Sequence, residues 1–138
     1  MAVVVWDPLF EFNIPAIDEQ HKQIVNMMNM IVEKLASGEI DEDVKIKCQE
    51  ALVYVANHFS DEEKLLDDIK YPALDIQKEM HKEIMAKLQD AKKEIDIGED
   101  IISKGIVEEL QEIVKKHIFV EDRKYSYFYH KGMMPPGV

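Results

Sequence analysis

The sequence has almost no cysteine, no long apolar run and no excess of basic residues. Its single cysteine, Cys48, cannot form an intrachain disulfide, so we expect a reducing, cytoplasmic environment. No apolar stretch approaches the roughly 20 residues that span a bilayer, so we expect no membrane insertion. The formal net charge is −11, which argues against a nucleic-acid partner, because such binding needs a basic face.

The composition is that of one globular domain. The chain has 138 residues, of which 46% are hydrophobic and 33% charged, enough to bury a core without indicating disorder. We therefore predict a single domain over 1–138. The oligomeric state is not indicated by any pattern in the sequence.

Apolar residues recur at intervals of three and four in four segments, which is the period of amphipathic helices. The predicted helices begin and end near Asp18 and Gly38, Asp41 and Asp67, Pro72 and Gly98, and Asp100 and Glu121. Four helices of similar length with short connections predict an all-α fold, an up-down-up-down antiparallel four-helix bundle over 18–122.

The segments on either side of the bundle lack a helical period. Residues 1–17 are predicted to be an extended arm that lies across a hydrophobic surface, with Asp18 as the N-cap of the first helix. The apolar members of this arm are Val5, Trp6, Leu9, Phe10, Phe12 and Ile14. Residues 123–138 are predicted to be a C-terminal tail that is irregular from Met133 to Val138, with His130 at the surface.

A histidine and a glutamate mark the inward face of the second predicted helix. His58 and Glu62 are four residues apart, so they lie one helical turn from each other. The apolar neighbours turn this face toward the core, where a metal ion can satisfy both groups. If neighbouring helices are antiparallel, polar residues of the other helices reach the same depth: His21, Gln77, His81, His117 and Asp122.

Asp122 meets this cluster only under one condition. It follows His117 by five residues, and on a regular helix the two side chains diverge by about 140°. The helix must therefore loosen or end between them.

The donor set favours two metal ions. Imidazole and carboxylate ligands suit iron, manganese or zinc, and paired carboxylates can bridge two ions. Each residue taken singly has an ordinary structural interpretation, such as a hydrogen-bonded pair for His58 with Glu62 or a surface position for Gln77. The shared depth and face of the whole set favours the metal site.

These residues also resemble the hemerythrin family, specifically the single-domain bacteriohemerythrins. The resemblance extends from Trp6 to about Tyr129. It is carried by the segments Ile17-Asp18-Glu19-Gln20-His21, His58-Phe59-Ser60-Asp61-Glu62-Glu63, Tyr71-Pro72 followed by His81, and His117-Ile118 followed by Asp122.

The resemblance implies a centre of two iron ions with an oxo or hydroxo bridge. Glu62 and Asp122 match the bridging carboxylates of the family. His21 and His58 match the ligands of the iron that binds dioxygen, and the other iron takes histidines, two of them matched by His81 and His117. The implied function is dioxygen carriage, storage or delivery, with an oxygen-consuming protein as a potential partner.

Gln77 departs from the family, which has a histidine there. Three outcomes stay open: Gln77 binds metal through its oxygen, water takes the place, or the metal is partly absent. An exchangeable position would favour an oxidase- or peroxidase-like redox enzyme or an oxygen or redox sensor. Metal buffering and a bundle with vestigial ligands are further alternatives.

An apolar pocket would keep water from bound oxygen. Its expected walls are Ile24, Phe59, Ile113 and Val114. Ile113 stands where the family often has tryptophan, and a smaller residue there would widen the access.

Overall fold

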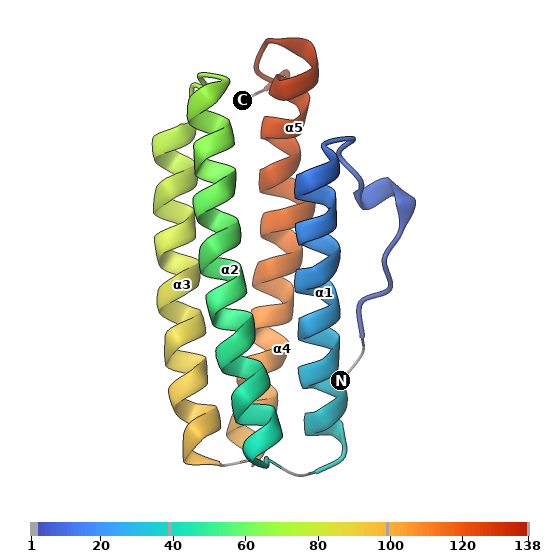
Figure 1. Cartoon of the computed structure of the whole chain (residues 1–138), viewed down its shortest axis with the longest axis vertical. Helices are drawn as coiled ribbons and strands as arrows, with labels where there is room; N and C mark the ends of the chain where they lie inside the picture. The colour runs from blue at the N-terminus through green and yellow to red at the C-terminus, as the bar shows by residue number, and fades with distance from the viewer. Residues whose placement is uncertain (1–2, 39, 99, 138) are drawn as a thin grey trace.

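The protein is an antiparallel four-helix bundle, seen in a computed structural model that describes residues 3–38, 40–98 and 100–137 (Figure 1). The long helices run up, down, up and down, which confirms the predicted fold class. In chain order the elements are η1 (Pro8–Phe10), α1 (Pro15–Ala36), α2 (Glu42–Asp68), α3 (Leu74–Ile97), α4 (Asp100–Lys116), η2 (His117–Glu121) and α5 (Asp122–Lys131). No described helix combines the length and the apolar run that a bilayer crossing requires.

Two of the predicted helix boundaries are set by local chemistry. The Asp41 side chain accepts a hydrogen bond from the Val44 N–H, which caps α2. Gly98 ends α3 with a φ of 87°, a left-handed conformation that glycine adopts without a steric penalty. Both boundaries agree with the sequence-based prediction.

The start of α1 differs from the prediction. The helix begins at Pro15, three residues earlier, where the fixed φ of proline suits a first helical position. Asp18 is therefore not the N-cap but lies buried in the first turn. Its carboxylate accepts hydrogen bonds from the backbone N–H groups of Phe12 at 2.8 Å and Ile14 at 3.3 Å. Asp18 thus anchors the arm rather than starting the helix.

The N-terminal arm lies beside α1 and crosses to η2 (Figure 1). Phe12 and Ile14 are buried, and Phe10 stacks on Phe119 with ring centroids 3.8 Å apart. Val5 is 77% exposed, so its predicted contact with a hydrophobic surface is wrong. The side chain of Leu9 lies outside the described residues. The arm is mostly extended, with the single turn of η1.

The fourth helix does not end near Glu121 as predicted, because α5 continues the line of α4 through η2 as far as Lys131 (Figure 1). Apolar packing explains the helix: Tyr125 is fully buried and belongs to a core cluster with Leu66 and Tyr71. His130 is exposed as predicted, yet its Nε2 lies 2.6 Å from the carbonyl oxygen of Phe12. This contact joins the C-terminal helix to the arm.

The core has three apolar layers along the bundle. The first surrounds Leu35 and Val44, the second Phe59 and the third Tyr125. Cys48 lies in the first layer, and burial raises the pKa of its thiol to about 11. A polar cluster lies at the boundary of the second and third layers. His21, Glu62 and His81 fall between the two layers along their helices, whereas His58 and His117 come directly before Phe59 and Ile118 of the second layer.

Candidate metal centre

The structure brings the polar residues singled out in the sequence into one buried cluster. Helices α1, α2, α3 and α5 and the segment η2 contribute to it, and none of these residues is more than 5% exposed. They are His21 from α1, His58 and Glu62 from α2, Gln77 and His81 from α3, His117 from η2, and Asp122 from α5. Gln77 is therefore not a surface residue.

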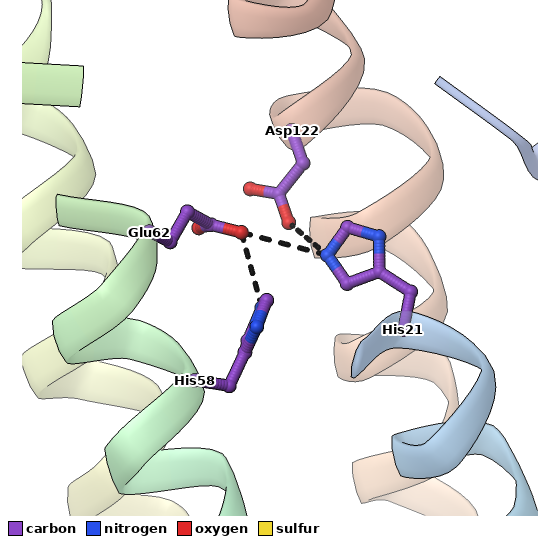
Figure 2. Close-up of side chains that lie close together, drawn as sticks. All are labelled: His21, His58, Glu62 and Asp122. Carbon is purple, nitrogen blue, oxygen red and sulfur yellow. Dashed lines mark ion pairs between the residues drawn. The ribbon is translucent and has the colours of Figure 1, made fainter. Parts of the chain in front are cut away.

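The first group of potential ligands comprises His21, His58, Glu62 and Asp122 (Figure 2). His21 Nε2 lies 3.3 Å from Asp122 Oδ2 and 3.5 Å from Glu62 Oε2. His58 Nε2 lies 3.0 Å from the same Glu62 oxygen. One ligand atom from each residue lies within 4.8 Å of the others, so a single ion could contact all four.

The second group uses the same two carboxylates together with His81 and His117. His81 Nε2 lies 2.9 Å from Glu62 Oε1, and His117 Nε2 lies 3.1 Å from Asp122 Oδ1. Each carboxylate therefore turns one oxygen toward each group. This division is the geometry required of a carboxylate that bridges two ions.

A local widening of the helix places Asp122 in the cluster. Residues 117–121 form the π-helical segment η2, and the Asp122 N–H donates to the His117 carbonyl oxygen. A bond across five residues closes a wider turn than the α-helical one. The condition stated from the sequence, that the helix loosens between His117 and Asp122, is met.

The Gln77 amide points into the second group. Its Nε2 donates to Asp122 Oδ1 and to Glu62 Oε1, the latter at 3.2 Å. The same nitrogen lies 3.5 Å from His81 Nε2 and 3.4 Å from His117 Nε2. Gln77 thus contacts every member of the second group.

Charge pairing outweighs burial in setting the pKa values of His21, His81 and Glu62. Burial alone lowers the pKa of His21, but the carboxylates of Asp122 and Glu62 raise it to about 9. Burial also lowers the pKa of His81, and Glu62 reverses this effect so that the net shift is upward. For Glu62, burial raises the pKa, but the nearby imidazoles of His21, His58 and His81 bring it well below its usual range.

Hydrogen bonds outside the cluster orient two of the rings. His58 Nδ1 lies 2.7 Å from Gln20 Oε1, while Gln20 Nε2 donates to Asp61. His81 Nδ1 lies 2.8 Å from the Glu63 carboxylate. Because these oxygens only accept, each Nδ1 carries a proton, and a neutral ring then has its Nε2 lone pair directed into the cluster. The sequence analysis assigned no role to Gln20, Asp61 or Glu63.

Tyr125 is a further contact that the sequence analysis missed. Its hydroxyl donates to Glu62 Oε2 at 2.8 Å, and both side chains are fully buried. Burial, followed by the charges of Glu62 and Asp122, raises the pKa of Tyr125 well above its usual value. The spacing held a signal, because Tyr125 follows Asp122 by three residues and so shares its helix face.

A small apolar cavity lies beside His58 and His117. Its volume is about 20 Å³, and its walls include Ile24, Phe59 and Val114, three of the expected pocket residues. Ile113 instead lines a separate groove together with polar side chains such as those of Glu83 and Lys116. A larger apolar cavity of about 90 Å³ shares Ile24, Val55 and Val114 with the small one.

The donor atoms fit a bound cation. Among the described residues, His21 Nε2, His58 Nε2 and Asp122 Oδ2 are buried without a hydrogen-bond partner, although carboxylate oxygens or imidazole nitrogens lie nearby. Unpartnered buried polar atoms are costly and rare in folded proteins. Four imidazoles with two carboxylates form a donor set that iron, manganese and zinc accept. A cation would satisfy these atoms together.

Fold and cluster together define a class, the helical bundles that hold a histidine–carboxylate metal site in their core. The chain matches the family model of the hemerythrin HHE cation binding domain over residues 13–128. It therefore belongs to the hemerythrin family, which confirms the resemblance seen in the sequence.

Several bacteriohemerythrins are similar to the chain over most of its length. That of Clostridium acetobutylicum is 31% identical over 126 residues, covering 88% of this chain and 97% of the relative. That of Stenotrophomonas maltophilia is 27% identical over 132 residues, covering 91% and 81%. That of Campylobacter jejuni is 25% identical over 129 residues, covering 91% and 94%.

Proposed function

We propose that this protein is a non-haem diiron protein that binds dioxygen, for carriage, storage or delivery. The observation that carries the proposal is the division of the Glu62 and Asp122 oxygens between two histidine groups. A site for one ion would have no need of carboxylates that face two ways. The relatives named bacteriohemerythrin support the same conclusion.

The residues of the chain would hold the two ions in two ligand groups that share their carboxylates. His21 and His58 would bind one ion and His81 and His117 the other, with Glu62 and Asp122 between them. When bound, two ferrous ions supply the electrons for reversible reduction of dioxygen. The protein's contribution is to hold the two ions at a fixed separation and to orient the rings of His58 and His81 through their outer hydrogen bonds.

The apolar cavity supports a site for a small uncharged molecule. Ile24, Phe59 and Val114 offer no hydrogen bonds to water, and the volume of about 20 Å³ is close to the minimum that holds one small molecule. Exclusion of water from this space would slow the loss of bound oxygen. Dioxygen is apolar and small enough for such a cavity.

A second candidate function is a diiron redox enzyme, oxidase- or peroxidase-like, or a redox or oxygen sensor module. One observation favours it: Gln77 presents an amide, not an imidazole, to the second group. An exchangeable position there would let another small molecule approach the metal.

The test is metal content per chain, followed by absorption spectra of the anaerobically reduced protein before and after exposure to oxygen. Two irons and a visible charge-transfer band that disappears on deoxygenation are the expected result. Two irons that oxidise without a reversible adduct would support the redox alternative. His58→Ala should abolish the band, whereas His130→Ala, at a histidine outside the cluster, should leave it unchanged.

A further inference from the structure

The Gln77 amide nitrogen occupies the middle of the second ligand group. It lies 3.2 Å from Glu62 Oε1, 3.4 Å from His117 Nε2 and 3.5 Å from His81 Nε2, and it also donates to Asp122. These four contacts are with the four residues that could together hold an ion. The amide nitrogen of Gln77 therefore occupies the position that a cation bound to these four residues would take.

The chemistry of the amide explains this position. An amide nitrogen carries two N–H donors and no lone pair available for a metal. It donates one hydrogen to each carboxylate, Glu62 and Asp122. With the amide reversed, its oxygen would face two carboxylate oxygens and would be repelled.

A histidine at this position would behave differently. One imidazole nitrogen can donate a hydrogen bond when protonated and bind a metal when deprotonated, without moving. Gln77 must instead remove its nitrogen and turn its oxygen inward before it could bind an ion. The same side chain that stabilises the metal-free site therefore opposes its occupation.

The two ligand groups differ in how well they are satisfied. The buried atoms without hydrogen-bond partners include Nε2 of His21, Nε2 of His58 and Oδ2 of Asp122, all of the first group. Among the described residues, no side-chain atom of Gln77, His81 or His117 has this status. The first group lacks a partner that a cation would supply, and the second already has one in Gln77.

We propose that the Gln77 amide takes the place of the second cation in the metal-free protein, so that the two sites fill in a fixed order with unequal affinity. The first ion binds at the His21 and His58 site. The second ion binds weakly and exchangeably at the His81 and His117 site, because it must displace the amide from both carboxylates. This inference rests on the two-ion centre of the proposed function and deepens it.

The first test is an anaerobic titration of the metal-stripped full chain with Co²⁺, followed by calorimetry and by the visible absorption of the bound ion. We expect two resolved steps of one ion each. The second dissociation constant should be larger than the first by at least about 100-fold, because the second ion displaces two charge-assisted hydrogen bonds. Gln77→His should bring the two steps together. Two equal steps in the wild-type protein would overturn the proposal.

A leucine variant distinguishes a Gln77 amide that competes with the second ion from a Gln77 amide that binds it. Leucine neither donates a hydrogen bond nor binds metal, so Gln77→Leu should tighten the second step if the amide competes with the ion. If Gln77 instead binds the ion through its oxygen, the same variant should weaken that step, and the proposal is wrong. Gln89→Leu makes the same change at an exposed position of α3 and should leave both steps unchanged.

A measurement on the wild-type chain covers the case in which Gln77→Leu does not fold. In ¹⁵N-edited NMR spectra, the two side-chain N–H signals of Gln77 should keep the downfield shift of hydrogen-bonded amides after one equivalent of diamagnetic Zn²⁺ and lose it only with the second. A small change with the first equivalent is expected, because Glu62 and Asp122 belong to both ligand groups. Loss of the downfield shift with the first equivalent would contradict the order of filling. Because neither titration involves dioxygen, failure here leaves the proposed function standing, and ordered filling without an oxygen adduct would contradict only that function.

Discussion

The hydroxyl group of Tyr125 offers a sharp test of how the buried carboxylates are stabilised. Tyr125→Phe removes one oxygen atom and keeps the ring, which packs edge-on against Phe12 and Tyr71. The lost hydrogen bond is the 2.8 Å contact with Glu62 Oε2. Packing is preserved, so the variant reports on that one bond.

The expected cost follows from burial and charge. Tyr125 and Glu62 are both 0% exposed, so water cannot replace the missing donor. A hydrogen bond to a charged group contributes about 1.5–3 kcal/mol. For a chain of this size, a loss of about 2 kcal/mol lowers Tm by about 8 °C. The loss should shrink in the metal-loaded protein, because cations then stabilise the same carboxylate.

Thermal unfolding followed by circular dichroism, with and without bound Zn²⁺, measures both effects. Tyr129→Phe is the matched control, since it makes the same change at an exposed position of α5 and should leave Tm unchanged. Equal Tm values for wild-type and Tyr125→Phe without metal would refute the reasoning. So would a loss of the same size in both metal states.

Three further predictions concern the charge, the bridge and the cavity. The pKa of His21 is raised from 6.5 to about 9, so the protonated ring contributes about 3 kcal/mol to the free energy of unfolding. This contribution is complete below pH 6.5 and is lost as the pH rises through 9. Urea unfolding of the metal-free protein at a series of pH values should show the loss, and the unfolding free energy of His21→Gln should depend less on pH. Glu62→Ala should reduce bound metal to one ion or none by elemental analysis, and two retained ions would contradict the bridge. Val114→Phe should overfill the small cavity, lowering the unfolding free energy by about 2 kcal/mol and slowing dioxygen association in stopped-flow absorption; an unchanged rate would argue against this cavity as the oxygen site.

The helices and the depth of the polar cluster could be predicted because both depend on local spacing. His58 and Glu62, four residues apart, must share a helix face wherever the helix lies. His21 and His117 then reach the same level by antiparallel packing alone. A pattern of three and four residues therefore predicts most of the centre before any tertiary contact is known.

The remaining features depend on which of several possible partners a side chain meets in the folded chain. Asp18 resembles an N-cap in the sequence, but the backbone N–H groups of Phe12 and Ile14 compete for its carboxylate. The direction of the Gln77 amide depends on Glu62 and Asp122, which lie on other helices. No property of the local sequence specifies such partners.

The π-helical segment η2 has a consequence for insertions and deletions. Relative to an α-helix, a wider turn accommodates one extra residue, so a return of η2 to regular helix at unchanged length would rotate everything after it by about 100°. Asp122, Tyr125 and Ser126, all buried on one face of α5, would then turn away from the core together. Loss of one residue within 118–121 would instead place Asp122 four residues after His117, on the same face of a regular helix. The number of residues in η2 and its helix form must therefore change together if the site is to be kept.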